Sequence, residues 1–330
     1  MSSSNPQKIV IRTPNWLGDL MMSTAFINAV LAKFPEARVD LIVRAGFEQL
    51  PLPHRGSVLA FDKQKQSAGN FGRMLRKEGY DNFYILPPSF SSAWMAFCSG
   101  VPNRIGYAGN FRKTLLRPAK SYQSPPRSQH LVKEYLTLLD EDLSLETHRP
   151  FLRISDSWVE QQLKKKQLPE KFAVFATGAI YGAAKQWPVS HFRQLAEQLV
   201  EPGQSILLVG TKADHDEGEK ICKDLQGVQN LCGQTSLTEL VAILAKAELL
   251  VSNDSGTMHI MTALQRPQIA IFGSTSPTWT GPLNPNAQVH YLELSCSPCF
   301  QRKCPFGHYR CLQQITPDQI LSKRGQSPLI

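Results

Sequence analysis

The chain has 330 residues, of which 42% are apolar and 19% are charged, and its formal net charge is +9. This composition excludes a disordered chain, and the length exceeds that of one ordinary hydrophobic core, which predicts two domains. No apolar run approaches the roughly 18 residues that cross a bilayer, and the N-terminal residues lack the apolar stretch of a signal peptide. We therefore expect a cytoplasmic protein.

The first half begins with a strand-like run, KIVIR (8–12), followed by a Pro-Asn-Trp turn. From about residue 17 to residue 34 apolar residues recur at helical spacing, which predicts a helix with one buried face. Three further apolar runs are predicted to be short buried strands: VDLIVR (39–44), VLAFD (58–62) and NFYIL (82–86). Strand, helix and strand in this order indicate a parallel sheet with helices on its faces.

The second half repeats this scheme. Strands are predicted at FAVFAT (172–177), SILLVG (205–210), LLVSND (249–254) and QIAIFG (268–273). Helices are expected near residues 190–200, 213–225, 236–248 and 255–264. Ser236, followed three residues later by Glu239, matches a capping box for the third of these helices.

The two halves together predict an α/β protein with two Rossmann-like domains that face each other across a cleft. The expected domains are residues 1–155 and residues 156–330. Ligands of such sheets bind at the carboxyl ends of the strands, where loops lead into helices. The residues that follow each predicted strand are therefore the first candidates for a functional site.

The segment VSNDSGTMH runs from a predicted strand straight into a predicted helix. The free N–H groups and the dipole of a helix N-terminus suit a diphosphate. Gly256 lets a phosphate approach the backbone closely, and Ser255 and Thr257 add hydroxyl donors. Asp254 is anionic, as phosphate is, so we expect it to accept hydrogen bonds from sugar hydroxyls or to cap the helix.

Three more residues are candidates for donor contacts. His259 lies one turn into the same helix, within reach of a phosphate or a sugar. Lys185 follows the first strand of the second half through a Gly-rich loop, where its charge would offset the charge that builds up on a departing diphosphate. Asp216 follows the next strand, and a carboxylate at such a strand end often holds ribose hydroxyls.

Asp19 lies just inside the first predicted helix, after the first strand. No Gly-x-Gly-x-x-Gly fingerprint occurs there, which argues against a dinucleotide cofactor and a nicotinamide oxidoreductase. A sugar transfer with inversion needs one base that removes the proton of the acceptor hydroxyl. Asp19 has the chemistry for that role, and stabilisation of the helix terminus is the alternative reading.

Basic residues dominate one stretch of the first half. No acidic residue occurs between Asp81 and Glu134, whereas seven Lys and Arg residues fall inside that interval. A positively charged region attracts anionic partners, such as a phosphorylated substrate or an anionic membrane face. Our candidates for contacts with an anionic acceptor are Arg104, Arg112 and Lys113.

Four of the seven cysteines cluster near the C-terminus, at Cys296, Cys299, Cys304 and Cys311. Cytoplasmic proteins rarely form structural disulfides, so a structural zinc or iron site is one interpretation. The spacing is not that of a standard zinc finger, and unbound thiols or disulfides remain as alternatives.

Four segments together resemble one family: PNWLGDLMMSTAFINAV, GAIYGAAKQWPVSHF, LLVSNDSGTMHIMTALQRPQIAIFGSTSP and CSPCFQRKCPFGHYRCL. They resemble the bacterial lipopolysaccharide heptosyltransferases, and most of all the heptosyltransferase II branch. The likeness covers nearly the whole chain. It implies a GT-B fold in which the N-terminal domain binds the acceptor and the C-terminal domain binds the nucleotide sugar.

The resemblance also implies an inverting transfer, without a catalytic metal or other cofactor, of L-glycero-D-manno-heptose from ADP-heptose. The implied acceptor is the phosphorylated Kdo–lipid A core that already carries one heptose. Asp19 corresponds to the family's catalytic carboxylate, and Lys185 to a donor contact. The other implied donor contacts are Asp216, Asp254, Ser255, Gly256, Thr257 and His259. A lipid acceptor would place the enzyme on the inner face of the inner membrane.

Other functions compete with this reading. Within the family they are heptosyltransferase I activity and heptosylation of a protein, since relatives that modify proteins carry an iron-binding cysteine cluster. A sugar-nucleotide epimerase would share the fold. A metal-bearing nucleic-acid binder is suggested by the pI of about 9.2 and by the cysteines. We expect no nucleic-acid partner, because the basic stretch and the cysteines lie in opposite halves and no nucleic-acid motif occurs.

Overall fold

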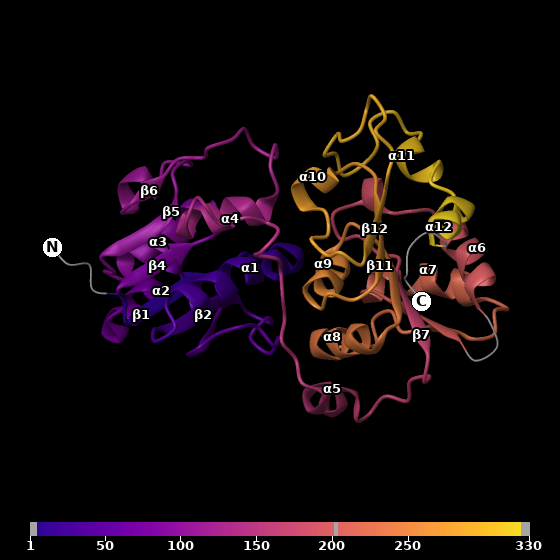
Figure 1. Ribbon diagram of the computed structural model, residues 1–330, viewed down its shortest axis with the longest axis horizontal. Coiled ribbons are helices and arrows are strands. Elements are labelled where there is room, and N and C mark those ends of the chain that lie inside the picture. The colour runs from indigo at the N-terminus through magenta and orange to yellow at the C-terminus, as the bar shows by residue number, and fades with distance from the viewer. Residues whose placement is uncertain (1–4, 201–203, 325–330) are drawn as a thin grey trace. The chain divides into compact units, whose positions relative to one another are not determined.

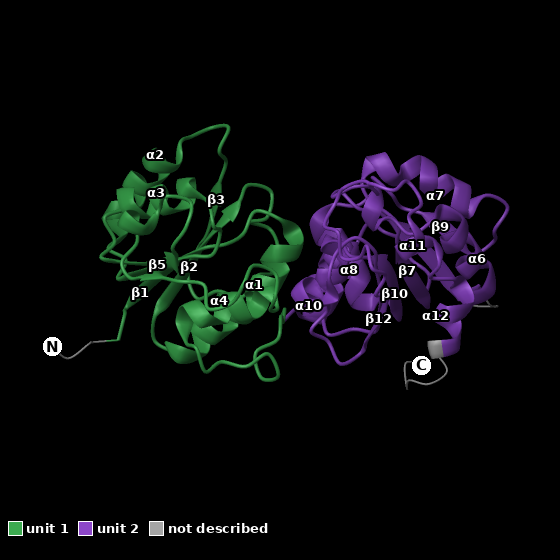
Figure 2. Ribbon diagram, turned by 90° about the horizontal axis from the view of Figure 1, so that it is seen from above, with its two compact units in different colours: residues 1–152 green, residues 153–330 purple. Residues whose placement is uncertain are grey.

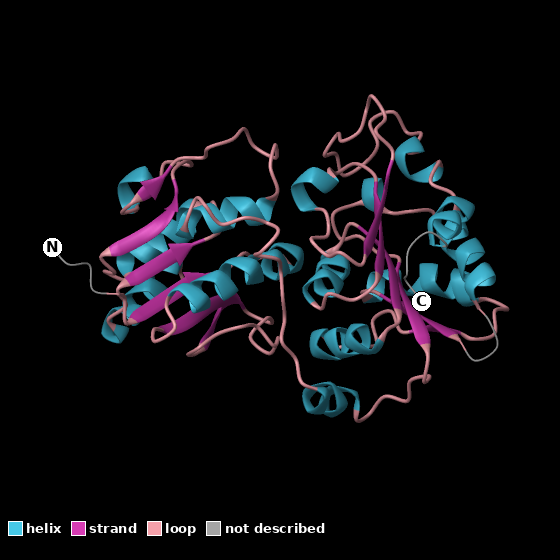
Figure 3. Cartoon of the chain, viewed as in Figure 1, coloured by secondary structure: helices cyan, strands magenta, loops and turns pink. Residues whose placement is uncertain are grey.

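The computed structural model describes residues 5–200 and 204–324, and the chain divides into two compact units, residues 1–152 and 153–330 (Figure 2). The division falls three residues before the boundary expected from the sequence. Each unit contains one six-stranded sheet, and a helix follows most of the strands along the chain (Figure 3).

The sheet of the first unit has the strand order β3-β2-β1-β4-β5-β6, and all of its pairings are parallel. Its strands are β1 (Lys8–Arg12), β2 (Arg38–Arg44), β3 (Val58–Phe61), β4 (Asn82–Ile85), β5 (Asn103–Tyr107) and β6 (Ala119–Lys120). Its helices are α1 (Leu17–Lys33), α2 (Ala68–Leu75), α3 (Phe90–Cys98) and α4 (Leu131–Leu139). The pairs α2–α3 and α1–α4 cover opposite faces of the sheet (Figure 2).

The sheet of the second unit has the order β12-β11-β10-β7-β8-β9, again with parallel pairings. Its strands are β7 (Phe172–Ala176), β8 (Ser205–Val209), β9 (Val228–Asn230), β10 (Leu249–Asn253), β11 (Gln268–Phe272) and β12 (Ala287–Tyr291). Renumbered within the unit, this order equals that of the first sheet. It is the doubly wound order, in which the first three strands extend to one side of the sheet and the next three to the other, and ligands of such sheets bind at the switch point between the first and fourth strands.

The second unit begins with α5 (Asp156–Leu163) and has helices on both faces of its sheet (Figure 1). The others are α6 (Val189–Leu199), α7 (His215–Cys222), α8 (Leu237–Lys246), α9 (Gly256–Ala263), α10 (Pro277–Thr280), α11 (Arg310–Gln313) and α12 (Pro317–Arg324). The capping box predicted for α8 is confirmed, because Ser236 Oγ accepts from Glu239 N and the Glu239 carboxylate accepts from Ser236 N.

Each strand predicted from an apolar run is present in the structure. The prediction that β3 is buried is wrong, because β3 lies at the edge of its sheet and only Phe61 of its residues is buried. The central strands are buried on both faces. All five residues of β7, β10 and β11 are buried, as parallel strands between two helix layers must be. The core of the second unit joins Phe175 and Val251 of the sheet to Trp187 and Phe192. This packing fixes the strand ends from which the candidate site residues project.

Candidate functional site

Asp254 lies at the junction between β10 and α9, at the carboxyl end of the second sheet. It is 4% exposed. Its Oδ2 accepts hydrogen bonds from Lys185 Nζ at 2.5 Å and from Thr275 Oγ1 at 2.6 Å. His259 Nε2 lies 3.7 Å from Oδ1. The N-cap of α9 is Ser255, so helix capping is not the role that Asp254 has in this structure.

The surroundings of Asp254 keep its carboxyl group ionised. Burial alone raises the pKa of a carboxyl group, but the neighbouring imidazole of His259 and ammonium of Lys185 outweigh burial. Together they hold the pKa of Asp254 well below its ordinary value. The site therefore contains a fixed negative charge next to two cationic or hydrogen-bonding groups.

Lys185 ends a short 3₁₀ helix, η3 (Ala183–Lys185), which follows the Gly-rich loop after β7. Its ammonium group lies 4.8 Å from the centre of the Tyr181 ring as well as against Asp254. Trp187 anchors the segment, because its N donates to Asn253 Oδ1 and its buried indole Nε1 donates to Ile315 O. An ammonium group has three donors, so two remain for a ligand when one is bonded to Asp254.

Several hydroxyl groups around this junction are buried without a hydrogen-bond partner in the described part of the chain: Ser255 Oγ, Ser274 Oγ and Thr177 Oγ1. A buried polar atom normally has a partner, so such a group often marks a ligand position. Ser255 begins α9 without forming a side-chain cap. Its hydroxyl and the first N–H groups of α9 are thus available to an anion at the positive end of the helix dipole.

Asp216 lies on the first turn of α7, and its side chain is 96% exposed. Its neighbour Asp214 is instead bonded to Thr211, whose N and Oγ1 both donate to Asp214 Oδ2 at 2.7 Å. A Cβ atom added to Gly178 would lie only 2.4 Å from that carboxylate. Gly178 is therefore required for the close approach of the loop after β7 to Asp214.

Asp19 lies in the first turn of α1 and is half-buried. Burial and then the negative charge of Asp19 raise the pKa of Tyr135 on α4 well above its ordinary value. Because β1 ends at Arg12 and α1 begins at Leu17, Asp19 lies near the carboxyl end of a strand of the first sheet.

The three basic candidates for acceptor contacts differ in exposure. Arg112 is 1% exposed and donates to the main-chain oxygens of Pro87, Ser89 and Tyr107, so it is part of the interior and not of an exposed basic surface. Arg104 also donates hydrogen bonds to main-chain oxygens. Lys113 is exposed. The sequence could not distinguish these residues, because each is a basic residue in a polar segment.

The four-cysteine segment packs against the loops around Asp254. Tyr181 Oη donates to Phe300 O, Phe300 N donates to Ser274 O, and Ala184 N donates to Arg302 O. All four cysteines are free. Within residues 5–200 and 204–324, no group of three or more His, Cys, Asp or Glu residues is arranged to hold a metal ion. The expected zinc or iron site at Cys296, Cys299, Cys304 and Cys311 is therefore not supported, and the observed role of the segment is packing.

Thr275 and Ser274 were not predicted from the sequence to be site residues. They follow β11, the strand next to β10, so the rule that ligands bind at strand ends applied to them as well. Their sequence, GSTSP, looks like an ordinary turn. Only the bond from Thr275 to Asp254 identifies the segment as part of the same site.

The fold and this junction define the class as an α/β protein with two doubly wound units and a buried polar cluster at a strand end of the second sheet. Comparison with known proteins makes the class specific. Residues 68–310 match the family described as glycosyltransferase family 9 (heptosyltransferase). The chain belongs to this family and is a glycosyltransferase.

Two relatives match along almost their whole length. The chain is 30% identical to lipopolysaccharide heptosyltransferase 2 of Escherichia coli (strain K12), over 96% of this chain and 97% of that protein. It is also 30% identical to lipooligosaccharide heptosyltransferase 2 of Haemophilus influenzae, over 96% and 98%. The solved structure of E. coli ADP-heptose LPS heptosyltransferase II superposes with a TM-score of 0.84, at 29% identity and over 97% and 98% of the two chains. The two-domain fold implied by the resemblance is thereby confirmed.

Proposed function

We propose that this protein transfers heptose from ADP-heptose to the inner core of lipopolysaccharide, onto an acceptor that already carries one heptose. The full-length likeness to relatives named heptosyltransferase 2 carries this proposal. The buried Asp254–Lys185 pair and the unpaired hydroxyl groups beside α9 support a nucleotide-sugar donor in the second unit.

On the donor side, Ser255, Thr257 and the backbone of Gly256 would hold the diphosphate at the N-terminus of α9. Lys185 keeps its place through Asp254 and directs its remaining N–H donors at the oxygen of the leaving ADP. Preorganised donors of this kind stabilise charge that develops in the transition state. His259 and Asp254 are assigned to the sugar, and Asp216 to the ribose.

On the acceptor side, Asp19 would remove the proton of the attacking hydroxyl group. The bond between this oxygen and the anomeric carbon of heptose forms as the bond from that carbon to ADP breaks, and the configuration inverts. A positioned carboxylate contributes about 10²–10⁴-fold to such a proton transfer. No step of the proposal needs a metal ion, so incubation with EDTA should leave the turnover rate unchanged.

The experiment is incubation of the purified chain with ADP-heptose and a panel of acceptors, read by mass spectrometry. The panel contains Kdo–lipid A without heptose, the same lipid with one heptose, and a protein acceptor. A gain of one heptose by the second lipid alone supports the proposal. Transfer to the lipid without heptose, or to the protein instead of a lipid, contradicts it.

We also propose that the enzyme works in the cytoplasm against the inner face of the inner membrane. No helix among the described residues is long and apolar enough to span a bilayer, so contact would be peripheral. On α3 the side chains of Phe90, Trp94 and Phe97 are all more than a third exposed, and their spacing places them on one helix face. Aromatic residues of this kind favour the membrane–water interface.

A further inference from the structure

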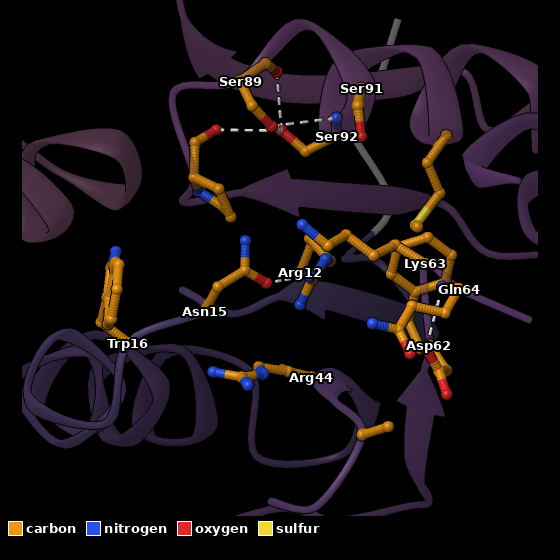
Figure 4. A pocket seen from close by; sticks show the side chains of 14 residues that line it. Arg12, Asn15, Trp16, Arg44, Asp62, Lys63, Gln64, Ser89, Ser91 and Ser92 are labelled. Atoms are coloured by element: carbon orange, nitrogen blue, oxygen red, sulfur yellow. Dashed lines mark hydrogen bonds between the residues drawn. The ribbon is translucent and has the colours of Figure 1, made fainter.

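The first unit contains a cationic pocket of about 610 Å³ at the ends of its strands, with Arg12, Arg44 and Lys63 in its lining (Figure 4). This pocket belongs to the unit to which the proposed function assigns the acceptor. The departure of ADP depends instead on the second unit, where the ammonium group of Lys185 lies 4.8 Å from the centre of the Tyr181 ring. The roles assigned above include none for Tyr181.

The cysteine segment, residues 296–311, holds the Tyr181 ring. Tyr181 is half-buried, and its Oη donates to Phe300 O at 2.6 Å. Phe300 N in turn donates to Ser274 O at 2.7 Å. The φ of Phe300 is +54°, a left-handed conformation that residues other than glycine seldom adopt and that persists only where surrounding contacts determine it. The hydroxyl group of Tyr181 is therefore bonded to a fixed point of the segment.

The same ring contacts two cations. Besides the ammonium group of Lys185, the guanidinium group of Arg302 lies 5.5 Å from the ring centre. The face of an aromatic ring attracts a cation within about 6 Å, and the attraction is stronger when the cation is shielded from water. The side chain of Lys185 is only 14% exposed, whereas Arg302 is an exposed residue. The contact with Lys185 is therefore the stronger of the two.

The bond to Asp254 does not by itself fix the direction of the Lys185 ammonium group. Asp254 Oδ2 accepts one hydrogen bond from Nζ, and an ammonium group has three donors on a flexible side chain. A group bonded at one point can still turn and shift about that bond. When it must also stay against the Tyr181 ring, fewer positions satisfy both contacts. The remaining two donors then keep one direction before the ligand binds.

We propose that Tyr181 is a positioning residue whose ring directs the ammonium group of Lys185 at the leaving phosphate. The inference rests on the proposed function, which assigns Lys185 to the departing ADP. Donors that are in place before charge develops contribute most to the rate. The cysteine segment then has a role beyond packing, because it holds the ring that positions the lysine.

The binding test compares ADP with AMP, which lacks the phosphate that departs from the sugar. Calorimetry gives the Kd of both nucleotides for the wild type and for Tyr181→Leu. The ratio of the AMP Kd to the ADP Kd should fall about fivefold or more in Tyr181→Leu, because the ammonium group loses its cation–π contact. A ring that only packs the loop would affect both nucleotides alike. An unchanged ratio therefore overturns the proposal.

Two further variants control this test. Ile180→Ala changes the neighbouring residue of the same loop, which is 79% exposed, and should leave the ratio within twofold of the wild type. Tyr181→Phe keeps the ring and loses the hydroxyl group, so its ratio should stay well above that of Tyr181→Leu. Equal losses in Tyr181→Phe and Tyr181→Leu overturn the role of the ring. Both affinities come from one preparation, so a fraction of unfolded protein cancels in the ratio.

A double-mutant cycle tests whether Tyr181 acts through Lys185. Lys185→Gln removes the cation but leaves the rest of the nucleotide site in place. In this background the additional change Tyr181→Leu should alter the ratio of the two Kd values less than twofold, because the ring has no ammonium group left to direct. A decrease as large as that in the wild-type background overturns the positioning role.

The kinetic consequence is a fall of about tenfold in kcat for Tyr181→Leu, with the acceptor KM changed less than twofold, because a misdirected ammonium group weakens contacts in the transition state. A kcat within twofold of the wild type overturns the proposal. The nucleotide ratio needs no transfer and separates this inference from the proposed function. A selective loss of ADP preference in a protein that transfers no heptose would uphold the positioning role while the proposed function fails.

Discussion

Asp254 shows how a single buried residue depends on its neighbours. It is a carboxylate almost without solvent contact, and it is acceptable in the interior because Lys185, Thr275 and His259 surround it. Lys185 lies 69 positions away in the sequence. The sequence predicted both residues as separate donor contacts, and the structure pairs them before any ligand is bound. Their ion pair therefore stabilises the fold in addition to its proposed role in catalysis.

Removal of this carboxylate tests the structural part. Asp254→Asn leaves the buried ammonium group of Lys185 without a counter-ion, so we expect a loss of about 3 kcal/mol in the free energy of unfolding at pH 7. Because the pKa of Asp254 is lowered on folding, its contribution is present above the ordinary carboxyl pKa of about 4 and is lost as the pH falls below it. Denaturant titrations between pH 7 and pH 3 measure the difference. Glu160→Gln, an exposed charge of the same unit, should change stability little.

Asp19→Asn tests the proposed base. The amide keeps the shape of the side chain but cannot accept the proton, so turnover should fall about 10²–10⁴-fold. Affinity for ADP-heptose, measured by calorimetry, should stay within a few-fold, because donor contacts are assigned to the second unit. Turnover near the wild-type rate would rule out the base assignment.

At the scale of elements, local patterns predicted the central strands and the cap of α8. They did not predict β5 or α3. β5 reads NRIGY, a polar and short run, and α3 reads FSSAWMAFC, with apolar residues around most of the helix. Neither sequence has the alternation or the stripe on which a prediction rests. β5 forms because it completes a sheet, and α3 because it packs on α2.

Gly182 lies where the loop before Lys185 packs against the cysteine segment, which is far away in the sequence. Its φ of +146° lies outside the range that other residues prefer, and an added Cβ would meet Arg302 O at 2.5 Å. Gly182→Ala should separate the Lys185 loop from the cysteine segment, lower the free energy of unfolding by about 1–3 kcal/mol and raise the KM for ADP-heptose.

Gly46→Ala is the control for this prediction. Gly46 also has a positive φ, of +96°, but nothing lies within 4 Å of the added Cβ. It therefore carries the conformational cost without the steric contact. Equal losses of stability in the two variants, with an unchanged donor KM in both, would mean that the contact with Arg302 is unimportant.

At the scale of the whole molecule, the two units repeat one strand order and carry different chemistry at equivalent edges. The first has the cationic pocket around Arg12, and the second has the Asp254–Lys185 junction. The first unit also has the exposed aromatic face of α3. Trp94 and Phe97 stack at 5.6 Å, and the guanidinium group of Arg104 lies 5.7 Å from the Phe97 ring.

This face leads to a prediction about membrane contact. The double variant Trp94→Ser with Phe97→Ser should reduce binding to vesicles of anionic lipid about fivefold or more, because it removes apolar area that would enter the interface. Co-sedimentation at low and at physiological salt measures the bound fraction. Phe306→Ser removes an exposed aromatic residue of the second unit and should have little effect. Equal binding by all three proteins would exclude α3 as the contact.

The sequence by itself determined the doubly wound class of both halves, the strand ends that carry Asp19, Lys185 and Asp254, and the family. These features depend on apolar periodicity and on motifs within a few residues of each other, which the chain displays directly. The tertiary structure decided which polar residues meet. It buried Arg112 among main-chain oxygens. Among the residues that the structure describes, it left the cysteines without a metal-binding arrangement and buried Arg12 with no carboxylate in an ion pair with it. Such outcomes depend on contacts between distant strand ends, which no local pattern encodes.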